Sequence, residues 1–158
     1  FITNEFIRKR VLVTGGTAGI GEAVASRLLD GGANVITTSR NTKSDHEERK
    51  HLFIEADLST PKGCTKIINE VGSRFGGVDI LVNVFGASSA PSGGFSVLSD
   101  EKWQKELNIN LLAAVRLDRG LLPSMIKQGS GVIIHISSIQ RMLPLYEATL
   151  AYAAAKAA

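Results

Sequence analysis

The sequence predicts an α/β protein in which a doubly wound parallel sheet is covered by helices on both faces. Two observations predict this class. Short apolar runs rich in β-branched residues alternate with segments of helical spacing. A glycine-rich turn, TGGTAGIG, joins the first apolar run to the first helical segment. With 158 residues, of which 44% are hydrophobic, the chain can bury one core, so residues 1–158 are expected to form a single domain.

Five segments are predicted to be strands, because each is short, apolar and rich in Val, Ile or Thr. They are residues 10–15, 34–39, 52–56, 78–84 and 131–138. Strands that alternate with helices form parallel sheets with both faces buried. The expected architecture therefore has three layers, helix, sheet and helix (αβα), and stops after the fifth strand and the start of the next helix.

The first two helices are predicted from apolar residues that recur every three or four positions. The inward face of the first is formed by Ile20, Val24 and Leu28. In the second, Ser59 or Thr60 is the cap and Pro61 lies in the first turn. Its inward face carries five apolar residues, Cys64, Ile67, Ile68, Val71 and Phe75.

A long third helix is expected after Ser99, because acidic residues at 100 and 101 suit the first turn of a helix. Its inward residues are expected to be Trp103, Leu107, Leu111, Ala114 and Leu121. Residues 40–50 are polar and are expected to form a turn or a shrunken helix. Residues 86–96 are rich in Gly and Ser and are expected to form a mobile loop beyond the fourth strand.

The composition argues against several function classes. The net charge is only +3, and the basic residues 8–10 are interpreted as the entry to a strand, not as a nucleic-acid patch. No apolar run approaches the ~20 residues that span a bilayer, so no membrane association is expected. Cys64 is the single cysteine, which excludes an internal disulfide and favours the cytoplasm. His46, His51 and His135 lack ligand spacing, so no metal site is expected.

The glycine turn predicts a nucleotide site. Gly15, Gly19 and Gly21 stand where a strand turns into a helix, and glycine allows positive φ and a close approach to a pyrophosphate. The spacing is GxxxGxG where the common fingerprint is GxGxxG. Glu22 follows the last glycine, whereas the phosphate loop of kinases and ATPases has Lys and Ser or Thr there. A Rossmann-type dinucleotide site is therefore favoured over a turn that serves packing alone.

The end of the second predicted strand favours NADP(H) over NAD(H). About twenty residues after the glycine turn, an acidic side chain would bind the ribose hydroxyls of NAD, and an arginine would pair with the extra phosphate of NADP. The sequence has Ser39 and Arg40 there and no acid. The alternative is a surface arginine in a polar loop.

From about Lys9 to its last residue, the chain resembles the short-chain dehydrogenase/reductase (SDR) family. TGGTAGIG is similar to that family's cofactor motif, and four motifs stand in the family's order. The resemblance implies an enzyme that moves hydride between NADP(H) and a carbonyl or secondary alcohol. It also implies cofactor contacts from Thr17 and Ile20 in the glycine turn.

The motif YAAAK places Tyr152 four residues before Lys156, so the two side chains share one face of a helix. A nearby ammonium lowers the pKa of a tyrosine from about 10 by favouring the phenolate. The resemblance implies that Tyr152 is the general acid/base, and that Lys156 lowers its pKa and holds the nicotinamide ribose. The alternative is an alanine-rich surface helix that carries both residues by chance.

The motif HISSIQ ends the fifth strand, where open α/β sheets bind ligands. The resemblance implies that Ser138 is the catalytic serine, with Ser137 as the alternative. The spacing to Tyr152 is one residue longer than is usual in the family, and Arg141 stands where glycine is common. A further alternative is that the hydroxyl only caps the loop.

Asn110 lies on the apolar face of the long helix, where an amide without partners would cost about 1–3 kcal/mol. A partner is therefore expected. The resemblance implies that its backbone carbonyl holds a water in a proton relay from the lysine. Asn108 points to another face of the predicted helix.

Four weaker positions complete the implied cofactor site. Asp57, followed by Leu58, resembles the family's acid at the adenine, although a local cap of the loop is the alternative. In the motif NVFG, Asn83 and Gly86 match the family pattern. Phe85 is bulkier than the alanine that is usual there.

The sequence begins with Phe1 and stops shortly after Lys156, so a longer protein is expected. The resemblance implies that this protein is a homodimer or homotetramer, paired through the helices that carry Asn110 and Tyr152. A protein that binds or senses NADP(H) without catalysis is the alternative. The substrate is not identified beyond a small carbonyl or alcohol.

Overall fold

The computed structural model describes residues 4–40 and 52–158. Within them, five parallel strands form one sheet in the order β3-β2-β1-β4-β5. The strands are β1 (Arg10–Thr14), β2 (Asn34–Ser39), β3 (Leu52–Glu55), β4 (Ile80–Asn83) and β5 (Val132–His135). All five predicted strands are present, and the predicted fold class is confirmed. The strand order reverses between β1 and β4, which is the point at which open α/β sheets bind ligands.

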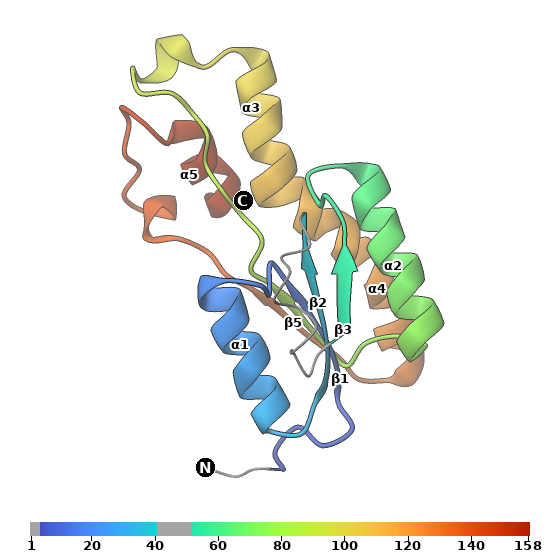
Figure 1. The fold of residues 1–158 in the computed structure, drawn as a ribbon. Coiled ribbons are helices and arrows are strands. Elements are labelled where there is room, and N and C mark those ends of the chain that lie inside the picture. The colour runs from blue at the N-terminus through green and yellow to red at the C-terminus, as the bar shows by residue number, and fades with distance from the viewer. Residues whose placement is uncertain (1–3, 41–51) are drawn as a thin grey trace.

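Helices cover both faces of the sheet (Figure 1). Helix α1 (Gly19–Asp30) lies on one face, and α2 (Pro61–Phe75) and α4 (Ala113–Gln128) lie on the other. One apolar core packs the sheet against α1, and a second packs it against α2 and α4. This is the predicted three-layer arrangement.

Two further helices lie beyond the carboxyl ends of the strands, namely α3 (Asp100–Leu107) and α5 (Leu150–Ala157), and they contact each other (Figure 1). The predicted loop 86–96 is irregular except at its end, where the 3-10 helix η2 (Phe95–Val97) begins. A second 3-10 helix, η4 (Ile139–Arg141), follows β5. The predicted turn or short helix at 40–50 lies outside the described residues, apart from Arg40.

The start of α2 decides between the two expected caps. Thr60 Oγ1 accepts a hydrogen bond from Gly63 N at 3.0 Å, whereas the Ser59 hydroxyl donates to Asp57. Thr60 is therefore the cap.

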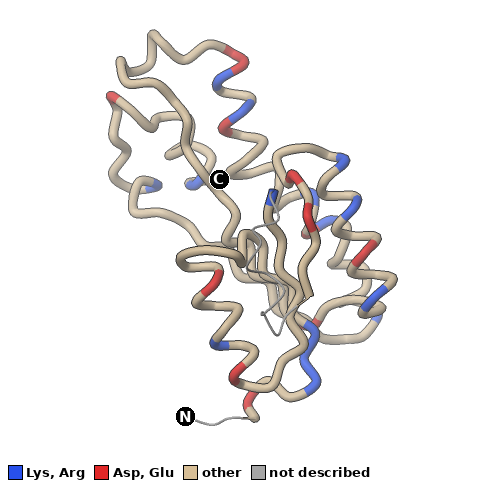
Figure 2. Tube along the Cα trace, in the orientation of Figure 1, with Lys and Arg blue, Asp and Glu red and all other residues tan. Residues whose placement is uncertain are grey.

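Charged residues of both signs lie on the outer surfaces of α1, α2 and α3 (Figure 2). Among the helices of the described segments, none is long and apolar enough to cross a membrane.

The expected inward face of α1 is wrong at Ile20, which is 61% exposed. The buried residues of this helix are Gly21, Ala25 and Leu28. A Cβ at Gly21 would lie 2.3 Å from the Gly15 carbonyl oxygen, so the helix approaches the preceding turn through this glycine. Ile20 is thereby turned outward in the first turn.

The expected inward face of the long third helix is wrong by one position over its first part, whereas Leu121 is buried as expected. Here α3 continues through the π-helical turn η3 (Asn108–Leu112) into α4. Four of the expected inward residues, Trp103, Leu107, Leu111 and Ala114, are only half-buried. The buried face is formed by Glu106, Asn110, Ala113, Leu117, Leu121 and Met125. The reason is that the first part of this face packs against the backbone of the loop after β4, which needs polar partners.

Candidate active site

The glycine turn forms an open cradle at the start of α1. Gly15 has φ of 65° and Gly19 has φ of 55°, conformations that favour glycine. A Cβ at Gly19 would have no neighbour within 4 Å, so the turn faces open space there. Ala18 precedes α1 and makes no side-chain cap, which leaves the first N–H groups of the helix to bind an anion. The turn, which includes the predicted residues Thr17, Ile20 and Gly21, therefore fits the pyrophosphate of a dinucleotide.

Thr14 and Gly16 also build this turn, although the sequence pattern alone predicted no role for either residue. Thr14 is fully buried, and its Oγ1 accepts hydrogen bonds from Val84 N and Phe85 N at 3.0 Å each. A Cβ at Gly16 would lie 2.5 Å from Thr37 Cγ2, so only glycine fits. A polar residue at the end of a buried strand was the signal for Thr14. These contacts fix the segment after β4 against the turn.

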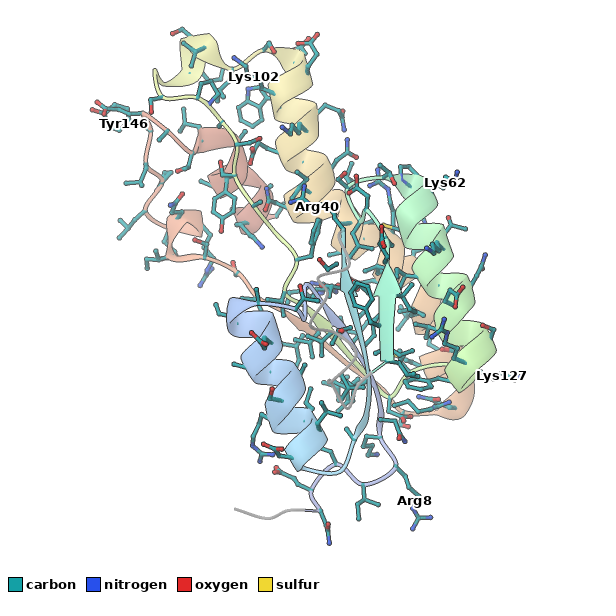
Figure 3. All side chains as sticks on the ribbon, in the orientation of Figure 1. Arg8, Arg40, Lys62, Lys102, Lys127 and Tyr146 are labelled. Carbon is teal, nitrogen blue, oxygen red and sulfur yellow. The ribbon has the colours of Figure 1, made fainter. Side chains whose placement is uncertain are left out.

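The end of β2 lies next to the cradle. Gly15 N donates to Thr38 Oγ1 at 3.4 Å, and Ser39 and Arg40 follow directly. Arg40 is exposed at the carboxyl end of the strand (Figure 3). The structure therefore places exposed Arg40 at the carboxyl end of β2, two residues after Thr38, which contacts the glycine turn.

Asp57 and Leu58 follow β3 at the same edge of the sheet. Asp57 is exposed, and its Oδ1 accepts hydrogen bonds from Ser59 N at 3.0 Å and Ser59 Oγ at 2.7 Å. This is the local cap that was the alternative interpretation. The Leu58 side chain is 1% exposed and belongs to the core, so only its backbone can contact a ligand.

Tyr152 and Lys156 lie on the same face of α5, as their spacing predicts. Lys156 Nζ lies 5.9 Å from the centroid of the Tyr152 ring and donates to the Ile136 carbonyl oxygen at 3.0 Å. Burial lowers the pKa of Lys156 from its ordinary value. The second tyrosine, Tyr146, is 68% exposed in the loop before α5 and points outward (Figure 3).

Lys156 and Asn110 meet at Gly86. A Cβ at Gly86 would lie 2.9 Å from Asn110 Oδ1 and 3.0 Å from Lys156 Nζ, so both groups touch this glycine. Asn110 is buried, and its amide has the partners that its burial requires. Its Nδ2 donates to the Ala87 carbonyl at 2.7 Å, and its Oδ1 accepts from Ala87 N at 3.0 Å. Asn110, Gly86 and Lys156 thus form one junction.

Of the two candidate serines, only Ser137 contacts a residue of this junction, and each has a local partner. Ser138 Oγ accepts a hydrogen bond from Gln140 N at 3.2 Å and caps η4. Ser137 is exposed, and its hydroxyl donates to the Lys156 carbonyl at 3.1 Å. The capping role that was one alternative is therefore present for Ser138. The Ser138 hydroxyl can still donate a hydrogen bond to a ligand, because in the cap its oxygen acts only as an acceptor.

The Asn83 side chain is bonded to other side chains of the protein. Its Nδ2 donates to Asp118 Oδ1 at 2.9 Å and lies 3.4 Å from His135 Nδ1. His135 Nε2 in turn lies 3.2 Å from Asp118 Oδ2. The Asn83 side chain thus joins β4 to α4 and β5 and does not point into the glycine cradle.

Asn110, Ser137 and Lys156 line one cavity, together with Asn83 and Asp118. Phe85, which is bulkier than the alanine expected at this position, also lines the cavity. In the part of the chain that the structure describes, no group of three or more His, Cys, Asp or Glu side chains is arranged to hold a metal ion. The polar groups that line this cavity are the Lys156 ammonium, the Ser137 hydroxyl, two amides and the side chains of Asp118, His135 and Arg141. Tyr152 and Ser138 are not among its lining residues.

Sequence comparison finds similar proteins among oxidoreductases. A family model described as short chain dehydrogenase matches residues 9–158. The uncharacterized oxidoreductase YvrD of Bacillus subtilis (strain 168) is 35% identical over 144 residues, which are 87% of this chain and 54% of YvrD. The chain spans about half the length of the curated relatives it matches.

Solved structures of the same fold include a reductase and a dehydrogenase whose names each give a sugar as the substrate. L-sorbose reductase from Gluconobacter frateurii, complexed with NADPH and L-sorbose, is 34% identical with a TM-score of 0.88. That match covers 98% of this chain and 61% of the reductase. Thermoplasma acidophilum aldohexose dehydrogenase, in ligand-free form, is 30% identical with a TM-score of 0.85, over 98% of this chain and 58% of that chain.

Proposed function

The chain belongs to the short-chain dehydrogenase/reductase family, and from this membership we propose that it is the cofactor-binding and catalytic part of an NADP(H)-dependent oxidoreductase. The reaction is hydride transfer between the nicotinamide and a small carbonyl or secondary alcohol. The observation that carries the proposal is the junction in which Lys156 Nζ lies against Gly86, beside Asn110 and 5.9 Å from the centroid of the Tyr152 ring. Residues 1–158 form a single domain in this proposal.

Tyr152 is the general acid/base in the proposed mechanism. In reduction its phenol gives a proton to the substrate oxygen, and in oxidation the phenolate takes the proton back. Lys156 stabilises the phenolate by its positive charge, and its partial burial strengthens that interaction. Ser138 donates a hydrogen bond to the substrate oxygen and so orients it.

The cofactor, when bound, supplies or accepts the hydride. Its pyrophosphate would be held by the cradle of Gly15, Thr17, Gly19, Ile20 and Gly21. Lys156 would also hold the nicotinamide ribose, and the Asn110 backbone carbonyl would hold a water that returns protons to the lysine. Asp57 and the Leu58 backbone would contact the adenine, and Asn83 and Gly86 would support the ribose side.

NADP(H) is proposed over NAD(H) because Ser39 and Arg40 end β2 beside the cradle. The guanidinium of Arg40 is free of a described acidic partner and can pair with the extra phosphate. The similar L-sorbose reductase was solved with NADPH, which supports the choice. We expect fluorescence titration to give tighter binding of NADPH than of NADH, and Arg40→Ala to weaken NADPH binding about tenfold while NADH binding stays unchanged. Equal affinities would refute this part of the proposal.

Substitution of Tyr152 with phenylalanine tests catalysis against mere cofactor binding. We expect turnover of carbonyl substrates by the complete gene product to fall by at least about a thousandfold, because the proton donor is removed. NADPH affinity should stay within about twofold, because the ring remains. If the unaltered protein binds NADPH but turns over no carbonyl or alcohol, the alternative of a sensing protein replaces the proposal.

We also propose that the protein is a cytoplasmic homodimer or homotetramer. Helix α4 exposes Val115 and Leu122 by 42% each and Ile126 by 70%, and such apolar side chains favour a helical interface. Light scattering of the purified gene product tests this proposal. A monomeric mass at micromolar concentration would overturn it.

A further inference from the structure

A buried glutamate lies one helical turn before Asn110, and the proposed mechanism makes no use of it. Glu106 on α3 is 1% exposed. Its carboxylate has three donors: Oε1 accepts from Ser89 N at 2.8 Å and from Ser89 Oγ at 3.4 Å, and Oε2 accepts from Asn110 Nδ2 at 3.2 Å. A fully buried carboxylate is rare unless it is bonded, so these contacts have a structural purpose.

The contacts of Glu106 and Asn110 together clamp the loop that follows β4. Glu106 holds Ser89, and Asn110 holds both backbone groups of Ala87. The residue before Ala87 is Gly86, against which Lys156 Nζ is packed. Displacement of the Asn110 amide therefore moves the backbone that borders the Lys156 ammonium.

We infer that Glu106 is a positioning residue for the active site, which acts through Asn110 on Gly86 and Lys156. The inference rests on the proposed function for its catalytic consequence, but the clamp itself is a property of the chain alone. Glu106 touches neither Tyr152 nor Lys156 in any described contact, so its effect must pass through the amide and the loop.

A carboxylate is suited to this position, and an amide of the same shape is not. Ser89 N and Asn110 Nδ2 donate to the two oxygens at 2.8 and 3.2 Å, and Nδ2 also donates to the backbone carbonyls of Ala87 and Glu106. In glutamine one of these oxygens becomes an NH₂ group, which would meet a donor in either orientation of the amide. Glu106→Gln therefore removes one hydrogen bond without changing the volume of the side chain.

Amide hydrogen exchange of the protein without cofactor tests the clamp independently of activity. In Glu106→Gln we expect the protection of Ser89 N–H and of Ala87 N–H to fall together, each by about tenfold, the loss that one hydrogen bond implies. Ala87 N–H is bonded to Asn110 and not to Glu106, so its loss reports transmission through the amide. Glu101→Gln, the same change at an exposed site of α3, should alter neither. If only Ser89 loses protection, the inference is overturned.

If the Glu106→Gln variant does not fold, hydrogen exchange of the unaltered protein tests the clamp instead. In low urea, Ala87 and Ser89 should exchange through one common opening, with the same dependence on denaturant. If exchange at Ala87 and at Ser89 depended differently on urea, the two residues would open separately, which would contradict a shared clamp.

The catalytic consequence is tested by a double-mutant cycle with Asn110→Ala in the complete gene product. We expect Glu106→Gln to lower kcat by about 10- to 100-fold and to have little further effect once Asn110 is alanine. Multiplicative losses would show that Glu106 does not act through Asn110 and would overturn the inference. If the unaltered protein has no activity, the proposed function fails, while hydrogen exchange still decides whether the clamp exists.

Discussion

Replacement of Gly86 with alanine is expected to disturb the junction of Asn110, Gly86 and Lys156 with little harm to the fold. The added Cβ would lie 2.9 Å from Asn110 Oδ1 and 3.0 Å from Lys156 Nζ, both inside ordinary van der Waals distance. Asn110 is held at 2.7 and 3.0 Å by Ala87, so the ammonium at the end of a flexible chain is the group that moves. Overpacking costs about 1–3 kcal/mol in general, and we expect about 1 kcal/mol here because a lysine tip yields easily.

The expected loss of activity is larger than the loss of stability. A catalytic group displaced by part of an ångström costs about 10- to 100-fold in kcat/KM, or roughly 1.4–2.7 kcal/mol of transition-state stabilisation. Urea unfolding and steady-state kinetics with NADPH and a panel of carbonyl substrates measure the two effects. Gly72→Ala is the matched control, because a Cβ there has no neighbour within 4 Å, and it should stabilise α2 by about 0.5–1 kcal/mol with unchanged kinetics. Wild-type kinetics in Gly86→Ala would refute the assignment of Gly86 to the junction.

Three further predictions concern stability, measured by urea unfolding. Thr14→Val should cost about 2–4 kcal/mol, because the N–H groups of Val84 and Phe85 lose their acceptor; a cost below 1 kcal/mol would contradict the role assigned to Thr14. Thr60→Ala should cost about 1 kcal/mol through loss of the α2 cap, and Ser59→Ala less than half of that, whereas equal costs would contradict the assignment of the cap. The side-chain hydrogen bond from Arg10 lowers the pKa of Asp79 in the folded protein. The ionised carboxylate therefore stabilises the fold fully at a pH above its unfolded pKa of about 4. This contribution is lost as the pH falls through the lower pKa that Asp79 has in the folded protein. Asp79→Asn should therefore cost about 1–3 kcal/mol at pH 7 and less at pH 2–3, and a cost that does not change with pH would count against it.

The sequence predicted those features that depend on local pattern. All five strands follow from runs of β-branched residues, and the turn of Gly15, Gly19 and Gly21 follows from the need for positive φ and close backbone approach. The spacing of Tyr152 and Lys156 likewise placed both on one face of α5. These features need no knowledge of distant partners.

The predictions that were wrong concern features that depend on partners far along the chain. Glu106 looks like a solvent-facing charge, since nothing near it in the sequence shows that Ser89 will donate to it. For the same reason Leu107 and Leu111 were expected inward and Glu106 was not, although Asn110 was correctly expected on the buried face. A helix face that packs against loop backbone is selected by hydrogen bonding, and hydrophobic periodicity does not report that requirement.

The segment after β4 connects the two halves of the proposed site, because side chains hold its backbone from both ends. At its start, Thr14 from β1 binds Val84 N and Phe85 N, and the backbone of Phe85 lies 3.6 Å from the position of a Cβ on Gly15. At its end, Asn110 and Glu106 bind residues 87–89. Gly86 lies between these two anchors and forms the junction with Asn110 and Lys156. The backbone between the glycine turn and Lys156 is therefore fixed on both sides, which is the rigidity that the proposed hydride transfer between two bound molecules would require.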